Sequence, residues 1–423
     1  MADHPNPTAA QRGGRLADEL ADELDLRLAA ADEALVSGFP GDAVGRQPVH
    51  TVYVPGDVYR ADTGPSWGSA ALAAVEAHAG LFAEVAGGAD IVGRVQDKLG
   101  VEPIEDLRID FEDGYGARGD DVEDGHVLAA AAALAASVRD GTAPPFRGIR
   151  FKSLEAPTRR RGVRTLTLFV ARLLEVGGSL DGFVVTLPKI TSVDQVEAMA
   201  SMTARIEGSL GLAPGVLRFE LQIETSQSIV GPDGTALVAR MIRAADRRCT
   251  ALHYGTYDYS AFLGVPAAQQ SMEHPVADHA KQVMQVAAAG TGVRLSDGST
   301  NVLPVGEEAA VRRGWALHAR LVRRSLERGY YQGWDLHPAQ LPSRFAATYG
   351  FYRDGFDAAG DRLRGYLEQT GSSVLDEPAT ARALSDFLVR AADCGAVSAA
   401  EVAAATGIDS SELAALARPT RER

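Results

Sequence analysis

Short apolar runs alternate along this chain with longer segments whose apolar positions recur every three or four residues. The short runs predict strands, and most of the longer segments between them, such as 192–210 and 307–329, predict helices with one polar face. Strands that alternate with helices are typical of a parallel sheet. The expected strands are 50–57, 107–111, 149–152, 182–187, 219–223, 251–254, 292–298 and 334–336.

The segments outside and between these strands complete the predicted organisation. We expect a disordered leader over 1–15, then an amphipathic helix over 16–35 packed on the outside of a barrel. Residues 61–70 have the composition of a loop, and 71–86 that of a helix. After about Gly371 two or three short helices follow, one of them starting with a capping box formed by Ser398 and Glu401. The predicted divisions are 1–48 (leader and helix), 49–372 (catalytic barrel) and 373–423 (C-terminal helical cap).

Residues able to bind a metal or an oxyanion cluster at the ends of five of the predicted strands. In a (β/α)₈ barrel, the TIM-barrel fold, the active site lies at the carboxyl ends of the strands. The 423 residues are enough for one such barrel of roughly 250–300 residues plus helical extensions at both ends. The strand-end residues are Asp110, Glu112 and Asp113; Arg150 and Lys152; Lys189; Glu224; and Asp258.

Glu224 and Asp258 follow consecutive strands and form the predicted metal site. Carboxylates at neighbouring strand ends can share one hard cation, and Mg²⁺ typically binds one or two carboxylates together with substrate and water oxygens. Such an ion polarises a carbonyl and stabilises an enolate. The alternative for this pair is a capping or salt-bridging role without a metal.

Arg150 is the predicted anchor and catalytic partner for a carboxylate substrate, because a guanidinium can hold a carboxylate with two parallel hydrogen bonds. Its alternative is an ion pair with Glu112 or Asp113, and both roles are compatible. Asp110, Glu112 and Asp113 crowd three acids into four positions, which requires a nearby cation. We expect Asp110 to contact substrate, and Asp110, Glu112 or Asp113 to relay protons.

Lys189 is expected to bind and orient the substrate electrostatically, with Schiff-base formation as the alternative. No residue is identified by the pattern as the general base, so Asp376 and Asp386 of the tail remain candidates for a base supplied by a neighbouring subunit. His253 is expected to face the core and His337 to be structural.

Composition narrows the classes of partner and compartment. A net charge of −14 argues against general nucleic-acid binding, which needs a basic face. No run approaches the roughly 18 apolar residues of a membrane span, and the first residues lack the apolar region of a signal peptide. Two cysteines, Cys249 and Cys394, show no metal-ligand spacing and fit a reducing cytoplasm.

The sequences of these segments and their order along the chain resemble the HpcH/HpaI aldolase and citrate lyase family, especially its citrate lyase beta-subunit-like branch. The matching segments run from about residue 50 to 345 and are VYVPGD, RIDFEDGYG, IRFKS, TLPKI, QIETSQSI, HYGTYDYSAFLG and GWDLHPAQL. Two features depart from the family pattern. A 50-position interval separates Asp57 from Leu107, and RFKS stands where an Asn after the Arg is usual.

This resemblance implies a TIM barrel with Mg²⁺ on Glu224 and Asp258, and Arg150 on the keto-acid or its carboxylate. It also implies reversible carbon–carbon cleavage of a hydroxy-acid, or of its thioester, and assembly as a homo-oligomer, a trimer or hexamer. No basic, Gly-rich segment points to coenzyme A, so the acyl carrier stays open.

Two other functions are compatible with the sequence. One is a barrel enzyme that uses phosphoenolpyruvate or pyruvate at the same site, by analogy of fold. The other is DNA binding through the tail, whose residues 398–416 have the spacing of a helix-turn-helix but carry Asp409 and Glu412 rather than a basic run.

Overall fold

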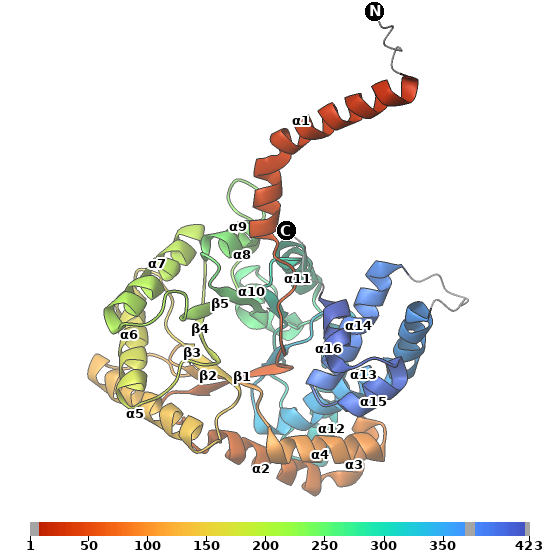
Figure 1. Cartoon of the computed structure of the whole chain (residues 1–423). Helices are drawn as coiled ribbons and strands as arrows, with labels where there is room; N and C mark the ends of the chain where they lie inside the picture. Colours follow the sequence, from red (N-terminus) through yellow and green to blue (C-terminus); the bar gives the residue numbers. More distant parts are fainter. Residues whose placement is uncertain (1–7, 369–376, 419–423) are drawn as a thin grey trace, which may run out of the picture.

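A computed structural model describes residues 8–368 and 377–418 and shows a (β/α)₈ barrel with helical extensions at both ends (Figure 1). Its eight strands are parallel and follow the order β7-β6-β5-β4-β3-β2-β1-β8. Between β7 and β8 the ring is completed by a bridge from Ser296 to Gln332. The strands are β1 (His50–Pro55), β2 (Asp106–Asp110), β3 (Phe146–Arg150), β4 (Phe183–Leu187), β5 (Arg218–Ile223), β6 (Cys249–Tyr254), β7 (Arg294–Ser296) and β8 (Gly333–Asp335).

Helices lie between successive strands and around the barrel, as the alternating pattern predicts. They begin with α1 (Ala9–Gly38), α2 (Thr63–Ala77), α3 (Ala79–Ala86), α4 (Ala89–Val101), α5 (Asp120–Arg139) and α6 (Arg159–Glu175). The middle group is α7 (Val193–Leu210), α8 (Ser226–Ile229), α9 (Leu237–Ala244), α10 (Thr256–Phe262), η1 (Ala267–Gln269) and α11 (Pro275–Ala288). The last group is α12 (Glu308–Glu327), η2 (Pro338–Gln340), α13 (Leu341–Leu367), α14 (Pro378–Asp393), α15 (Ala399–Thr406) and α16 (Ser410–Ala417).

The period of two along each strand separates apolar residues from charged ones. On β2, Leu107 and Ile109 are fully buried among apolar side chains, while Arg108 between them reaches Glu220 on β5. Successive side chains of a strand point to opposite faces, so alternate positions of β2 and β5 face the lumen of the barrel. Polar residues therefore reach the carboxyl end of the barrel from its interior.

Toward the amino ends of the strands, the lumen holds a buried charged network instead of the branched aliphatic layers common in such barrels. Arg108 donates from Nε and Nη2 to the two oxygens of Glu220 at 3.0 and 2.6 Å, and it also contacts Asp106. His253 Nε2 lies 3.1 Å from Glu220, and its Nδ1 accepts a hydrogen bond from the indole of Trp334 at 3.2 Å. Although burial raises it, the pKa of Glu220 falls below its usual range because of Arg108 and His253. His253 thus lies inside the barrel, as part of its core.

The N-terminal segment differs from the prediction. Helix α1 already begins at Ala9, within the stretch expected to be disordered, and residues 1–7 lie outside the described part. The expectation that this helix packs on the barrel is wrong, because α1 has no buried residue and extends away from the barrel (Figure 1). Its apolar pattern was read correctly as helical, but a pattern cannot show what an apolar face meets.

Residues expected to form a loop before residue 71 are helical instead. Helix α2 begins at Thr63 and includes Pro65, which fits because the first backbone N–H groups of a helix lack an intrahelical acceptor. The chain then bends by 98° between α2 and α3. Within the described residues, no single helix is long and apolar enough to cross a membrane. Only α2 and α3 taken together, as a bent pair, have the length and apolar composition of a span.

The C-terminal helices pack on the same chain. Phe387 on α14 contacts the rings of Tyr352 and Phe351 on α13, with centroids 5.1 and 5.8 Å apart. Helix α15 begins with the predicted capping box of Ser398 and Glu401. The apolar face of the tail is thus covered by α13, and the expectation that the tail of a neighbouring subunit supplies a base stays a prediction.

We predict that Arg108→Met destabilises the fold by about 3–5 kcal/mol, since it leaves Glu220 and Asp106 buried without their cation. Urea denaturation measures this loss. Arg323→Met, which removes an exposed ion pair with Glu327 and Asp354, is the control and should cost less than about 1 kcal/mol. The double variant Arg108→Met with Glu220→Gln should recover part of the stability. Equal unfolding free energies for Arg108→Met and the wild type would contradict the role of this pair.

Candidate active site

The carboxyl ends of strands β2 to β6 bring seven charged side chains into one connected group. Each of them was predicted from its position at or just after a strand, and each contacts at least one other member. The group, called the carboxylate site below, consists of Asp110, Glu112, Asp113, Arg150, Lys189, Glu224 and Asp258.

Asp110 at the end of β2 holds Arg150 at the end of β3. Arg150 donates from Nε and Nη2 to the two carboxylate oxygens, both at 2.7 Å. The same oxygens accept backbone N–H groups of Glu112 at 2.9 Å and Gly114 at 2.8 Å. A Cβ at position 114 would lie 2.6 Å from Asp110 Oδ2, so this close approach requires glycine. Asp110 is therefore fully engaged in fixing the guanidinium.

Arg150 uses Nε and Nη2 to bind Asp110, so only Nη1 lies outside this pair of hydrogen bonds. Nη1 lies 3.4 Å from Glu112, and the guanidinium stacks over the ring of Tyr53 at 4.6 Å. Burial opposes the charge, but Asp110 and Glu112 raise the pKa of Arg150 well above its usual value. Arg150 is thus a permanent, oriented cation, paired with Glu112 as the alternative reading expected.

Lys189 connects the acids of β2 with those of β5 and β6. Its ammonium lies 2.8 Å from Glu112, 2.6 Å from Asp113 and 3.5 Å from Asp258. Its backbone N–H donates to Glu224 Oε1 at 2.7 Å, and the residue adopts a left-handed conformation with φ of 50°. For a residue other than glycine this backbone costs about 1–3 kcal/mol, and such strain clusters at functional sites. Burial lowers the pKa of Lys189, but Glu224 and Glu112 outweigh it and raise the pKa above its usual value. 

Glu224 is almost completely buried at the end of β5. Its Oε2 accepts a hydrogen bond from Gln222 at 2.6 Å. A Cβ at position 255 would come within 2.9 Å of the same oxygen, so Gly255 lets the end of β6 pack directly on this carboxylate. Burial, together with Asp258 and Glu112, raises the pKa of Glu224 to about 8 despite the opposing charge of Lys189.

Glu112 and Asp113 are neighbours with opposite pKa shifts. Burial raises the pKa of Glu112, with Asp113 adding to it and Arg150 and Lys189 opposing. Burial also acts on Asp113, but its hydrogen bond with Lys189 prevails and lowers the pKa. Two acids whose pKa values are pushed apart can divide proton donation and charge stabilisation between them.

The carboxylate site contains more acids than cations. Five carboxylates face two cations, Arg150 and Lys189, so a surplus of negative charge remains. In the part of the chain that the structure describes, no three His, Cys, Asp or Glu side chains are grouped so as to hold a metal ion. A cation here would depend on one or two carboxylates plus substrate and water oxygens, which is a usual arrangement for Mg²⁺. The oxygen-only donor set and the raised pKa of Glu224 fit such an ion.

Some sequence-derived candidates lie elsewhere. Lys152 is mostly buried and binds Glu123 on α5 at 2.7 Å. Asp386 binds Arg390 and Arg418 within the tail, and Asp376 lies outside the described residues. Tyr53 and Gln222 were missed, although the period of two places both in the lumen.

Solved structures of similar fold were found by comparison. A citrate lyase from Burkholderia xenovorans LB400 superposes with a TM-score of 0.58 at 18% identity, covering 88% of this chain and 99% of that one. Protein CitE from Mycobacterium tuberculosis, in complex with magnesium, acetoacetate and coenzyme A, gives 0.47 at 16% identity over 86% and 99%. A malate synthase from Haloferax volcanii gives 0.47 at 14% identity over 72% and 76%. At these identities the likeness to the citrate lyase concerns the fold.

No curated protein matches the chain in sequence. A family model described as a domain of unknown function, DUF6986, matches residues 28–421, which covers the barrel, its C-terminal helices and the end of α1. The chain therefore belongs to the DUF6986 family.

Proposed function

We propose that this protein is a Mg²⁺-dependent carbon–carbon lyase that reversibly cleaves a hydroxy-acid, or its thioester, into a keto-acid and a second fragment. The observation that carries the proposal is the carboxylate site itself. An oriented guanidinium and five carboxyl groups, three of them buried, meet at the carboxyl ends of the strands. The fold shared with a citrate lyase and the motif order from residue 50 to 345 support the same reaction class.

Arg150 is assigned to the carboxylate of the substrate. Asp110 keeps Nε and Nη2, so the substrate is offered Nη1, next to Glu112. Asp110 then acts as a positioning residue that fixes the direction of Nη1. This differs from the expectation that Asp110 touches the substrate, and it retains Arg150 as the anchor.

Lys189 is assigned to orientation of the acids and the substrate by its charge. A Schiff base needs a neutral amine as nucleophile. Acidic neighbours raise the pKa of Lys189, so the amine stays protonated near neutral pH. Its contacts with Glu112 and Asp113 hold both acids at the mouth of the barrel.

Glu224 and Asp258 are assigned as the metal ligands. When bound there, Mg²⁺ would supply a Lewis acid that polarises a carbonyl and stabilises negative charge on its oxygen. Glu224 is buried and held by Gln222, whereas Asp258 is half exposed in the first turn of α10. One ligand is thus fixed by the barrel, and the other faces the side from which substrate enters.

Glu112 is assigned to proton transfer. Its raised pKa places it closer to neutral pH than an ordinary glutamate, which is the range where a general acid or base is efficient. It also lies between Arg150 and Lys189, the two cations that face the substrate. Asp113 remains ionised and keeps Lys189 in position.

The reaction class is tested by a substrate screen with the purified full-length chain, with and without Mg²⁺. The panel contains free hydroxy-acids, keto-acids, their coenzyme A thioesters and phosphoenolpyruvate. We expect cleavage or condensation of a hydroxy-acid or thioester that depends on Mg²⁺. Turnover of phosphoenolpyruvate alone would favour the alternative barrel chemistry and contradict the lyase.

We predict that Glu224→Gln and Asp258→Asn each lose Mg²⁺ binding and nearly all turnover while remaining folded. The reason is that an amide offers a weaker ligand for a hard divalent ion than a carboxylate. Calorimetric titration with Mg²⁺ measures the affinity. Glu197→Gln, an exposed acid on α7, is the matched control and should bind like the wild type. Unchanged Mg²⁺ affinity in both site variants would remove the pair from the site.

We predict that Arg150→Lys lowers kcat/KM by about ten- to 150-fold, corresponding to about 1.5–3 kcal/mol of lost transition-state binding. Lysine keeps the charge, but its ammonium cannot make two parallel hydrogen bonds to Asp110 and also offer a further planar N–H group to the substrate. Asp110→Asn should produce a smaller loss, mainly in KM, because the guanidinium remains but is no longer fixed. Steady-state kinetics of both variants provide the test, and near-wild-type values for Arg150→Lys would make Arg150 structural.

A further inference from the structure

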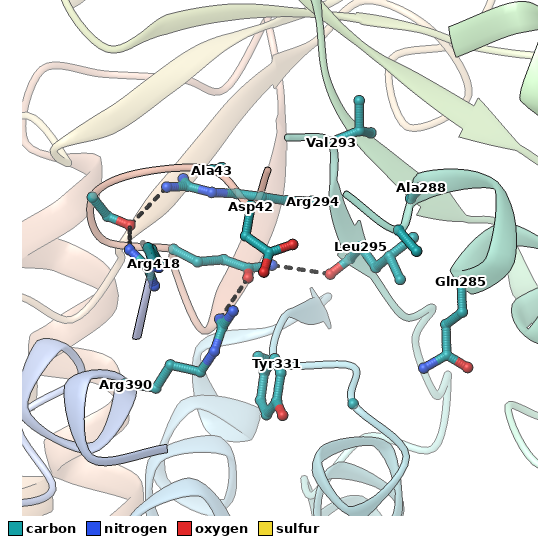
Figure 2. Close-up of a pocket in the computed structure, with 14 residues that line it drawn as sticks. Asp42, Ala43, Gln285, Ala288, Val293, Arg294, Leu295, Tyr331, Arg390 and Arg418 are labelled. Carbon is teal, nitrogen blue, oxygen red and sulfur yellow. Dashed lines mark hydrogen bonds between the residues drawn. The ribbon is translucent and has the colours of Figure 1, made fainter. Parts of the chain in front are cut away.

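A second group of charged residues surrounds a cavity at the opposite end of the barrel from the carboxylate site. The cavity measures about 220 Å³ and lies between the start of β7, the segment before β8, the segment before β1 and the C-terminal helices (Figure 2). Three arginines from separate parts of the chain line it: Arg294 begins β7, Arg390 lies on α14, and Arg418 follows α16.

Arg294 has no acidic partner among the ion pairs of the described residues. Its guanidinium donates instead to the backbone carbonyls of Val44 at 3.2 Å and Gly45 at 2.9 Å. Burial, and after it the charges of Arg418 and Arg390, lower the pKa of Arg294 to about 10. Its positive charge is therefore poorly compensated by the protein.

Arg390 and Arg418 share a single carboxylate. Asp386 accepts from Arg390 Nε at 2.6 Å and from Arg418 Nη2 at 3.2 Å. Arg390 also stacks on Tyr331 at 4.1 Å, which fixes its plane. Arg418 is nine-tenths buried, and its Nε has no hydrogen-bond partner in the described structure. A buried donor of this kind is unfavourable unless an ordered water or a ligand accepts from it.

Within the described residues, the other acids near the cavity do not form ion pairs with these three arginines. Asp42 lines the cavity, is exposed, and is bound to Arg382 at 2.9 Å (Figure 2). Asp393 is the other neighbouring acid, and burial raises its pKa despite the surrounding arginines. Among these described acids only Asp386 forms an ion pair with arginines of the cavity, so Arg294 lines the cavity without an acidic partner.

We propose that this cavity, called the arginine pocket, binds a small phosphate-bearing anion. Guanidinium groups match the geometry of phosphate oxygens, and a doubly charged anion would compensate the surplus better than a single carboxylate. The volume of about 220 Å³ accommodates inorganic phosphate or a short phosphomonoester, and we assign this class of ligand to the pocket. Because the three arginines come from the barrel and the tail, the ligand ties the tail to the barrel.

The test is calorimetric titration of the full-length protein with inorganic phosphate, and separately with glycerol phosphate, at constant ionic strength. We expect one site per chain and a loss of affinity of about tenfold or more in Arg294→Gln, corresponding to one charge-assisted hydrogen bond. Arg240→Gln, an exposed arginine paired with Asp233, is the matched control and should bind like the wild type. Tighter binding of the ester than of phosphate would identify an organic phosphate as the ligand, and the reverse order would identify inorganic phosphate.

Two further variants keep the test decisive if Arg294→Gln does not fold or if the anion binds at the carboxylate site. Arg418→Gln reports on the pocket independently if Arg294→Gln does not fold, and it should weaken binding in the same direction. Arg150→Lys changes the carboxylate site and should leave phosphate affinity unchanged. Wild-type affinity in both Arg294→Gln and Arg418→Gln would overturn the proposal. It would also be overturned if neither anion bound, or if only Arg150→Lys lost binding.

Discussion

Arg108 on β2 reaches across the lumen to Glu220 on β5, and this buried pair determines what the rest of the barrel can hold. Parallel strands place every second side chain inside, so a charge admitted at one position has to be compensated from another strand. Asp106 contacts Arg108, and His253 contacts Glu220. Toward the carboxyl ends of the same two strands, the alternation brings Asp110 and Glu224 to the lumen. The carboxylate site is therefore the carboxyl end of one charged column.

Compensation is uneven along this column. In the middle, Arg108 pairs with two acids, Asp106 and Glu220. The carboxyl end has surplus acids around Lys189, and at the amino end three arginines line the cavity of Figure 2. A net charge of −14 does not reveal this separation, because it averages over the whole surface. The two ends consequently suit different ligands: the carboxyl end suits a divalent cation together with an acidic substrate, and the amino end suits an anion alone.

Much of the barrel and of the carboxylate site could be predicted because both depend on local periodicity. A strand that ends in Asp110 or Glu224 brings that residue to the same rim as its neighbours, whatever the details of packing. The pairing within the site was less accessible. Only the fold shows that Asp110 occupies both prongs of Arg150, since the distance between strands and the approach of Gly114 decide it.

The segments outside the barrel show the same limit of local sequence patterns, which do not contain tertiary contacts. The amphipathic pattern of α1 indicated a helix correctly, but whether its apolar face is covered depends on contacts that no local pattern contains. The arginine pocket was missed for a similar reason. Arg294, Arg390 and Arg418 are far apart in the sequence, and each is unremarkable alone.

The ring of strands is thinnest between β7 and β8. Each of these strands has three residues, and besides the Ser296–Gln332 bridge the two sides are joined by the backbone bonds of Asp297 to Gln332 and Trp334 to Gly298. Local opening of a protein follows its least protected backbone hydrogen bonds. Amide protons between β7 and β8 should therefore exchange with solvent before those of β2 to β5. The barrel is expected to open locally at this point.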